Sequence, residues 1–353
     1  VSIILSKIPL VQIQNSWPSS WETILWNLRL PRITLAMLVG ASLAVSGATF
    51  QGLFRNPLAD PYLIGVAAGA TLGATIVFLT GIPFVFKGIS VLPIASFIGG
   101  VGAVSVAYGI GRNASDSQIG TLILSGVAIG AFATATASIL MLHSEPDLRP
   151  VLSWLMGSFI RTQWSHILYL ITYIGPGLAA VFLYSRILNT LQINEEYALS
   201  VGVNVNRTKL VLILITTMIT AAAVSFSGII GFVGLIAPHV ARLLWGNDYR
   251  ILIPMAAIVG AFFLVIADLM ARTVISPGEL PVGIITSLCG APFFLYLLHH
   301  LSNLLNPCLH LLILGLSQNQ YLQKNPVFQH LNIHLAFHED PPEVCQLVKQ
   351  PLL

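Results

Sequence analysis

The chain alternates long apolar stretches with shorter polar connections. Most stretches are close to the ~20 residues that an α-helix needs to cross a bilayer. Small residues are frequent within them, and such residues let membrane helices approach one another closely. The pattern predicts an all-α, polytopic membrane bundle whose spans lie at about 31–53, 62–80, 91–111, 119–142, 166–185, 208–227, 251–271 and 281–298.

One further apolar run, 228–237, is too short to cross ~30 Å of hydrocarbon and stops at Pro238. A broken helix survives in lipid only inside a bundle or beside an aqueous path. The Ser-Gly start at Gly228 and the proline at Pro238 are repeated in the same frame at Gly47 and Pro57. Two such segments in two halves of a chain are typical of an inverted repeat around a transport path, although an ordinary kinked span is the alternative.

Composition agrees with a membrane protein, because 56% of the 353 residues are hydrophobic and 8% are charged. About a quarter of the residues of a soluble domain are charged. The net charge of +3 comes from scattered basic residues, so no nucleic-acid partner is expected. The three cysteines are far apart, which predicts neither a disulfide framework nor a thiolate metal site. Membrane lipid and other proteins are the expected contacts.

Residues 1–30 are too polar for a span. The pattern Ser19-x-x-Glu22 is typical of a capping box that opens a short helix. Tryptophans are common where a helix meets the headgroups, and three lie here: Trp17, Trp21 and Trp26. We expect an interfacial helix that leads into the first span.

Two longer polar connections, 143–164 and 186–209, lie on opposite sides of the membrane, because one span separates them. The first contains an apolar run that favours a short surface helix. In the second, Asn194 is placed to cap a short helix through Leu199, and Gly202 then turns the chain. A short projecting helix is a candidate docking site for a soluble partner; a solvated loop is the alternative.

Three long segments, 28–70, 227–244 and 279–298, resemble the permease subunits of bacterial ABC importers for iron-siderophores, haem and cobalamin, the FecCD-type transmembrane permeases. They occur in the family's order, and the resemblance covers residues 1–298. It implies a ten-span permease with two inverted repeats in the bacterial inner membrane. The implied cargo is a metal chelate, with ferric siderophore favoured over haem and cobalamin.

The resemblance also implies partners. These are a second permease as homodimer or close heterodimer, two cytoplasmic ATPase subunits and an external substrate-binding protein. Residues 186–209 correspond to the coupling helices that hold the ATPase, and the matching positions are Glu195, Glu196, Leu199 and Gly202. The positions that contact acidic residues of the binding protein are Arg29, Arg32 and Arg272. Guanidinium groups present a fixed fork to carboxylates. For Arg272, an i,i+4 pair with Asp268 that only orients the arginine is the alternative.

The same resemblance places the translocation path at the dimer axis, with Gln118, Thr121 and Ser125 near its inner mouth. Helix packing is the alternative role, because Ser and Thr often bond to their own backbone. The chain has no GxxxxGK[ST] motif, so we expect ATP and Mg²⁺ on the partner ATPase and no cofactor here. No catalytic residues and no metal site are expected.

Two departures from the family pattern concern the ends of the chain. Family members usually open with one more span, and we expect an incorrectly chosen start to account for its absence before Val1. The tail, 299–353, continues beyond the usual end, and we expect it to be weakly ordered. Its His330, His334 and His338 recur every four residues, a spacing competent for a divalent metal on a helix, but a disordered tail is the favoured interpretation.

Two other classes of function are alternatives to an ABC permease. A secondary transporter driven by an ion gradient also uses inverted repeats, and it would need an intramembrane acidic residue, for which Asp268 is the candidate. A membrane enzyme is less favoured, since no nucleophile, base and orienting group can be assembled from the spans. We therefore expect a transport permease rather than an enzyme.

Overall fold

The computed structural model describes residues 17–80, 85–86, 89–111, 118–142, 149–160, 162–275 and 278–313. The chain divides into two compact units, 1–290 and 291–353. Six helical stretches of the described residues are long and apolar enough to cross a membrane: Ser19–Phe54, Val91–Gly111, Gly120–Leu142, Trp164–Leu183, Val205–Ser227 and Tyr249–Thr273. Three shorter apolar helices are Val66–Leu79, Val233–Trp245 and Val282–Leu297. The predicted all-α membrane bundle is confirmed.

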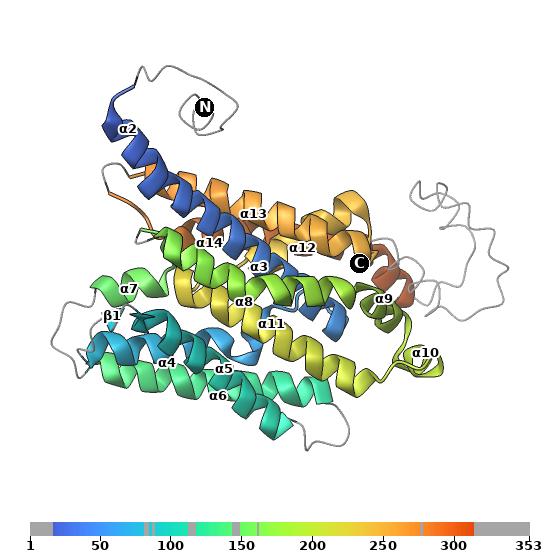
Figure 1. The fold of residues 1–353 in the computed structure, drawn as a ribbon. Coiled ribbons are helices and arrows are strands. Elements are labelled where there is room, and N and C mark those ends of the chain that lie inside the picture. Colours follow the sequence, from blue (N-terminus) through green and yellow to red (C-terminus); the bar gives the residue numbers. More distant parts are fainter. Residues whose placement is uncertain are drawn as a thin grey trace. The chain divides into compact units, whose positions relative to one another are not determined.

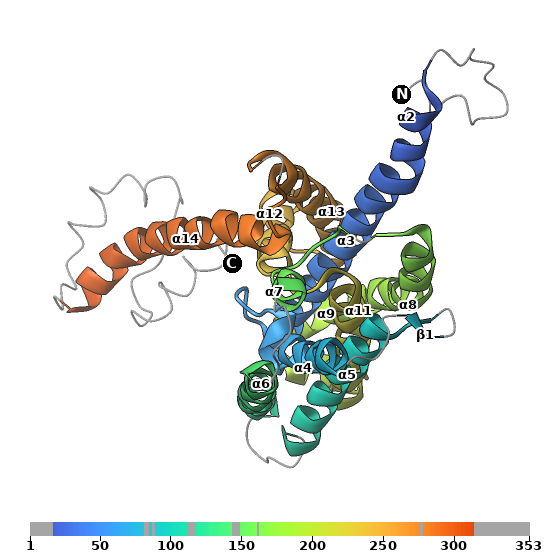
Figure 2. The same ribbon diagram turned by 90° about the vertical axis from the view of Figure 1, so that its left-hand side faces the viewer.

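The first unit is built around helix α3 (Leu30–Phe54), drawn in blue in Figure 1. Every residue of α3 from Ser42 to Leu53 is buried, as expected of a helix enclosed on all sides. Its neighbours are α8 (Trp164–Leu183), α11 (Val205–Ser227), α12 (Val233–Trp245) and α13 (Tyr249–Thr273). Helices α4 (Val66–Leu79), α5 (Val91–Gly111) and α6 (Gln118–Leu142) form a second group that contacts α11 through α4 and α5 (Figure 2).

Glycines allow these helices to touch backbone to backbone. A Cβ added to Gly40 of α3 would overlap the carbonyl of Gly260 of α13, and the reverse substitution would overlap Gly40. Gly69 of α4 and Gly99 of α5 meet in the same way. Between α4 and α5, strands β1 (Val85–Phe86) and β2 (Ile89–Ser90) pair antiparallel. The small residues of the sequence therefore serve close helix packing.

The predicted break is real, but its position was wrong. Helix α11 ends at Ser227, Gly228 adopts a φ of +72°, and α12 begins only at Val233. The half-length helix therefore follows the break and continues through Pro238 instead of stopping there. We call residues 228–232 the break segment.

The first glycine-proline pair of the repeated spacing, Gly47 and Pro57, lies in a different local structure from the second pair, Gly228 and Pro238. Gly47 lies inside the continuous helix α3, whereas Pro57 lies in the turn that follows it. After that turn, the 3-10 helix η2 (Pro61–Ile64) and Gly65, with a φ of +87°, lead into α4. A Cβ on Gly47 would overlap the carbonyl of Gly234 in α12. The segments around the two pairs are thus in contact, but they do not share the same backbone structure.

The N-terminal part of α3 also differs from the prediction. Helix α2 (Ser19–Ile24) and the π-helical turn η1 (Leu25–Arg29) continue directly into α3. Pro18 occupies the N-cap, and no side chain caps the helix, so the capping-box prediction at Ser19 was wrong. Only the part of the predicted 1–30 segment from residue 17 onward lies within the described residues, and it is an extension of α3 rather than a separate helix.

Candidate functional site

A polar contact inside the bundle explains how α12 tolerates its proline. Pro238 has no N–H, so it cannot donate the usual helical hydrogen bond to the carbonyl of Gly234. Gln51 of α3 donates its Nε2 to that carbonyl at 3.3 Å and accepts from Nη2 of Arg242 at 3.1 Å. Gln51 is only 2% exposed, and from within the bundle it bonds both the first turn of α12, at Gly234, and the last turn, at Arg242. Gln51 is a functional candidate that was not predicted from the sequence, although a polar residue in an apolar span is the signal that would have found it.

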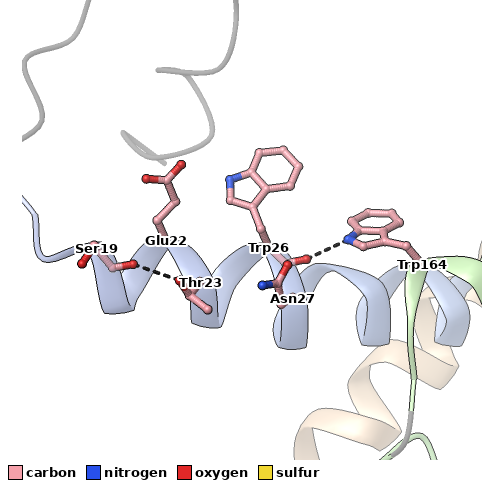
Figure 3. Close-up of a pocket in the computed structure, with 6 residues that line it drawn as sticks. All are labelled: Ser19, Glu22, Thr23, Trp26, Asn27 and Trp164. Atoms are coloured by element: carbon pink, nitrogen blue, oxygen red, sulfur yellow. Dashed lines mark hydrogen bonds between the residues drawn. The ribbon is translucent and has the colours of Figure 1, made fainter.

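The second proline of this kind lies at the start of α3. In a π-helical turn the carbonyl of Trp26 would accept from the residue five positions on, which is Pro31 and has no N–H. The indole Nε1 of Trp164 donates to this carbonyl at 2.8 Å, as Figure 3 shows. The two tryptophans line a shallow pocket of about 560 Å³ with Ser19, Glu22, Thr23 and Asn27. Trp164 thereby ties the first residue of α8 to the extension of α3.

A groove of about 760 Å³ runs along α6 beside the break segment. Asp60, the N-cap of η2, accepts from the backbone N–H of Tyr62 at 2.7 Å, and the Tyr62 hydroxyl donates to the carbonyl of Ile230 at 3.1 Å. These bonds hold η2 against the break segment at one wall. The facing wall is a row of small residues at four-residue spacing on α6: Gly126, Gly130, Thr134 and Ser138.

Two of the residues predicted for the translocation path, Thr121 and Ser125, are not among the described residues that line this groove. Ser125 is buried and donates to the carbonyl of Thr121 in its own helix at 2.6 Å. The side chain of Gln118 lies outside the described residues. Their role in a path stays a prediction. The G-x-x-x-G spacing of Gly126 and Gly130 is the sequence signal that would have located the groove wall.

An ion cluster fills the space between the N-terminal end of α3 and the C-terminal end of α13. Arg32 donates Nε and Nη2 to Asp268 at 2.8–3.1 Å and Nη1 to Glu279 at 2.8 Å. Arg272 also reaches Asp268, with its Nη2 at 3.2 Å from Oδ2. We call Arg32, Arg272, Asp268 and Glu279 the ion cluster. Asp268 is only 1% exposed and is bound by the guanidinium groups of both arginines. These two opposite charges offset the cost of burying its carboxylate.

This cluster changes the interpretation of the predicted docking arginines. Arg29 is exposed at the end of η1, whereas Arg32 is 9% exposed and already bound by two carboxylates. Arg272 is partly exposed, and its Nε donates to the carbonyl of Asp268 at 3.3 Å, so the i,i+4 alternative is present. Their docking role stays a prediction, and Arg29 is the one of the three with an exposed side chain.

The predicted cap and turn in 186–209 are confirmed. Helix α9 (Ser185–Ile193) is followed by Asn194, whose side chain accepts from the N–H of Glu196, and then by α10 (Glu195–Ser200) and Gly202 at a φ of +84°. Nζ of Lys209 binds both oxygens of Glu195 at 2.8 Å, which fixes α10 to the start of α11. The apolar side chains of this segment that remain exposed are Ile193, Tyr197, Leu199 and Val201.

Helix α9 is also bonded to the bundle beneath it. Gln192 donates Nε2 to the carbonyl of Gly52 in α3 at 2.6 Å. Asn189 donates to Asp248 at 2.6 Å and accepts from the backbone N–H of Tyr249 at 2.8 Å. The bonds from Arg250 lower the pKa of Asp248 well below its usual value and fix this N-cap of α13. Movement of α9 therefore has a direct mechanical connection to α3 and α13.

The family model of the FecCD transport family matches residues 2–300 of this chain. The chain belongs to the FecCD transport family. It is 45% identical over 286 residues to the cobalamin import system permease BtuC of Halobacterium salinarum, covering 81% of this chain and 76% of that protein. It is 41% identical over 295 residues to the hemin transport system permease HmuU of Yersinia pestis, covering 82% and 88%. A solved metal-chelate type ABC transporter in an inward-facing conformation matches with a TM-score of 0.75 and 31% identity over 85% of this chain and 95% of that chain.

Family membership confirms the resemblance found in the sequence. The FecCD chain is a multi-pass membrane protein, a permease of the ABC importer class rather than an enzyme. The secondary-transporter alternative loses its candidate coupling residue, because Asp268 is bound by two arginines. No group of three or more His, Cys, Asp or Glu residues is placed to hold a metal within the described part of the chain. The three tail histidines, His330, His334 and His338, lie outside that part.

Proposed function

We propose that this FecCD chain is the permease of an importer in the bacterial inner membrane that moves a metal chelate with energy from a separate ATPase. The observation that carries the proposal is the exposed apolar surface of Ile193, Tyr197, Leu199 and Val201 on α10 and its flanks. An exposed apolar patch on a rigidly held helix is typical of a protein-docking site. Here the patch sits on the helix pair that is bonded to α3, α11 and α13.

In this proposal the coupling segment, 186–209, faces the cytoplasm and holds the ATPase, where ATP and Mg²⁺ bind. Leu199 and Glu196 are exposed for that contact, while Glu195 and Gly202 shape the segment. Closure of the ATPase pair would displace α9 and α10, and the bonds of Gln192 and Asn189 would carry the displacement to α3 and α13. Rigid-body movement of packed helices is a standard means of transmitting such a change.

The groove along α6 is our candidate for the wall of the translocation path. Two permeases, identical or closely related, would enclose the path between their grooves. Among the described residues that line the groove Asp60 alone is charged, and its carboxylate accepts the N–H of Tyr62. Small residues and hydroxyl groups give such a wall little affinity for any one cargo, so selection would belong to an external binding protein. The cargo is proposed as a ferric siderophore, with haem and cobalamin as the competing chelates.

The test begins with affinity purification of the tagged full chain from a bacterial membrane. We expect an ATPase subunit with a P-loop to co-purify, and reconstituted vesicles to accumulate one chelate when ATP and a binding protein from the same cell are present. Ferric siderophore, haem and cobalamin are compared directly. If the chain purifies without an ATPase, and uptake collapses when the proton gradient is removed, the proposal that a separate ATPase drives transport through this chain is refuted.

A matched pair of variants tests the docking surface itself. Leu199 is 60% exposed, so Leu199→Asp should fold normally but lose the ATPase during purification. Leu199→Met keeps an apolar side chain of similar size and should retain it. Equal ATPase recovery with both variants would remove the coupling segment from the proposal.

A further inference from the structure

The pocket between Trp26 and Trp164 lies where the bundle meets the lipid headgroups. Helix α3 contains 25 residues and is therefore ~37 Å long, enough to cross the ~30 Å hydrocarbon core. Trp26 precedes the first residue of α3 by one helical turn, and Trp164 is the first residue of α8. Tryptophans are enriched at this level of a membrane protein. We call this pocket, lined by Ser19, Glu22, Thr23, Trp26, Asn27 and Trp164, the tryptophan pocket (Figure 3).

The charge of the tryptophan pocket favours a cationic group. The lining residues from α2 and η1 are three or four positions apart, so they share one face of the helix. Glu22 is the one charged residue among the described lining residues, and these include no lysine or arginine. Indole rings attract an ammonium group through their negative faces. A carboxylate and two indoles at one pocket therefore suit an ammonium ion better than an anion.

Trp26 adds a donor that the described part of the chain does not use. Its Nε1 is buried and has no hydrogen-bond partner among the described residues. In Figure 3 this nitrogen lies on the side of the ring toward Glu22. A buried donor without an acceptor is costly, so an oxygen supplied by a bound molecule would stabilise this arrangement. The indole of Trp164 is already fixed, because its Nε1 donates to the Trp26 carbonyl.

An exposed apolar track leads from the tryptophan pocket into the bilayer along α8. Leu168 and Ile171 lie four and seven positions after Trp164, so the three side chains share one face of the helix. Leu168 is 67% exposed and Ile171 is 45% exposed. A molecule with a polar head in the pocket and a hydrocarbon chain on this track would match both surfaces. A phospholipid has this form.

We propose that the tryptophan pocket binds a phospholipid with an ammonium headgroup, such as phosphatidylethanolamine. A phosphate oxygen accepts from Nε1 of Trp26, and the ammonium lies between that phosphate and the carboxylate of Glu22, against the indole rings. One acyl chain follows Leu168 and Ile171. An anionic lipid such as phosphatidylglycerol meets the same N–H, but its phosphate faces Glu22 without an ammonium between them. The bound lipid joins α2 to α8, and this inference depends neither on the cargo nor on the ATPase.

The test is native mass spectrometry of the purified full chain titrated with each lipid. The wild type should bind phosphatidylethanolamine at least about fivefold more tightly than phosphatidylglycerol. Glu22→Gln should reduce this ratio to within about twofold, because the selecting charge is gone. Trp26→Phe should weaken the binding of both lipids, since both phosphates use its N–H, while its carbonyl still accepts from Trp164. The matched control is Trp245→Phe, because Trp245 is 45% exposed at the end of α12 and does not line the pocket.

Three results would each overturn the proposal. These are equal affinity of the wild type for the two lipids, an unchanged ratio in Glu22→Gln, and a loss in Trp245→Phe as large as that in Trp26→Phe. Glycerophosphoethanolamine, which has the same headgroup but no acyl chains, separates a lipid from a soluble ligand. It should compete only at a concentration about a hundredfold or more above that of the lipid. Competition at the lipid's own concentration would overturn the assignment to a phospholipid.

Discussion

Gln51 offers the sharpest test of how the bundle holds its broken helix. Replacement by leucine preserves the approximate volume of the side chain but removes both of its bonds, to the Gly234 carbonyl and to Arg242. A neutral hydrogen bond contributes about 1 kcal/mol, and a bond to a charged group about 1.5–3 kcal/mol. Because Arg242 is partly exposed and water can replace part of its bond, we expect Gln51→Leu to lower the free energy of unfolding by about 2–3 kcal/mol.

Two further variants separate the contributions. Gln51→Glu keeps an acceptor for Arg242 and adds its charge, but it cannot donate to the Gly234 carbonyl that Pro238 leaves without its helical donor. We expect it to recover part of the loss. Thr49→Val is the control, since Thr49 is equally buried in α3 but its hydroxyl donates only to the carbonyl of Val45 in its own helix.

The assay is reversible unfolding of the purified chain in detergent, followed by tryptophan fluorescence. A Gln51→Leu variant within about 0.5 kcal/mol of the wild type, the usual effect of an inconsequential substitution, would refute the reasoning. So would a loss in Thr49→Val as large as that in Gln51→Leu. Either result would mean that α12 is held by packing alone and that the freed carbonyl has little energetic weight.

Three further predictions use the same unfolding measurement. Gly260→Ala should cost about 1–3 kcal/mol through overlap with the Gly40 carbonyl, whereas Gly102→Ala, which meets nothing within 4 Å, should be neutral or stabilising; equal effects would contradict the close-packing argument. Trp164→Phe should cost about 0.5–1 kcal/mol and speed proteolysis of α2, because the Trp26 carbonyl loses its donor; unchanged proteolysis would count against that bond. Asp248→Asn should be less stable than the wild type at neutral pH. The pKa of Asp248 is lowered in the folded state, so the ionised side chain stabilises the fold fully above the usual aspartate pKa, and this stabilisation is lost as the pH falls. The difference in unfolding free energy between the wild type and Asp248→Asn should therefore shrink below about pH 4. A difference that grows below that pH would contradict this pH dependence.

Local patterns in the sequence determined the helices and the family. The apolar stretches located the spans because hydrocarbon requires a fixed helix length and complete backbone bonding. Asn194 and Gly202 located the short helix α10 because capping and a left-handed turn depend on residues close in sequence. The long motifs of residues 28–70, 227–244 and 279–298 identified the permease family before any contact was known.

Tertiary structure alone decided which polar groups meet. Arg32 reads as a surface arginine in the sequence, but its partners Asp268 and Glu279 lie 236 and 247 positions away. Pro238 reads as the end of a helix, yet α12 continues through it because Gln51, 183 positions from Gly234, bonds the carbonyl that the proline leaves without its helical donor. Such pairings depend on the packing of distant helices, and the spacing of residues along one helix carries no information about which distant side chain will reach it.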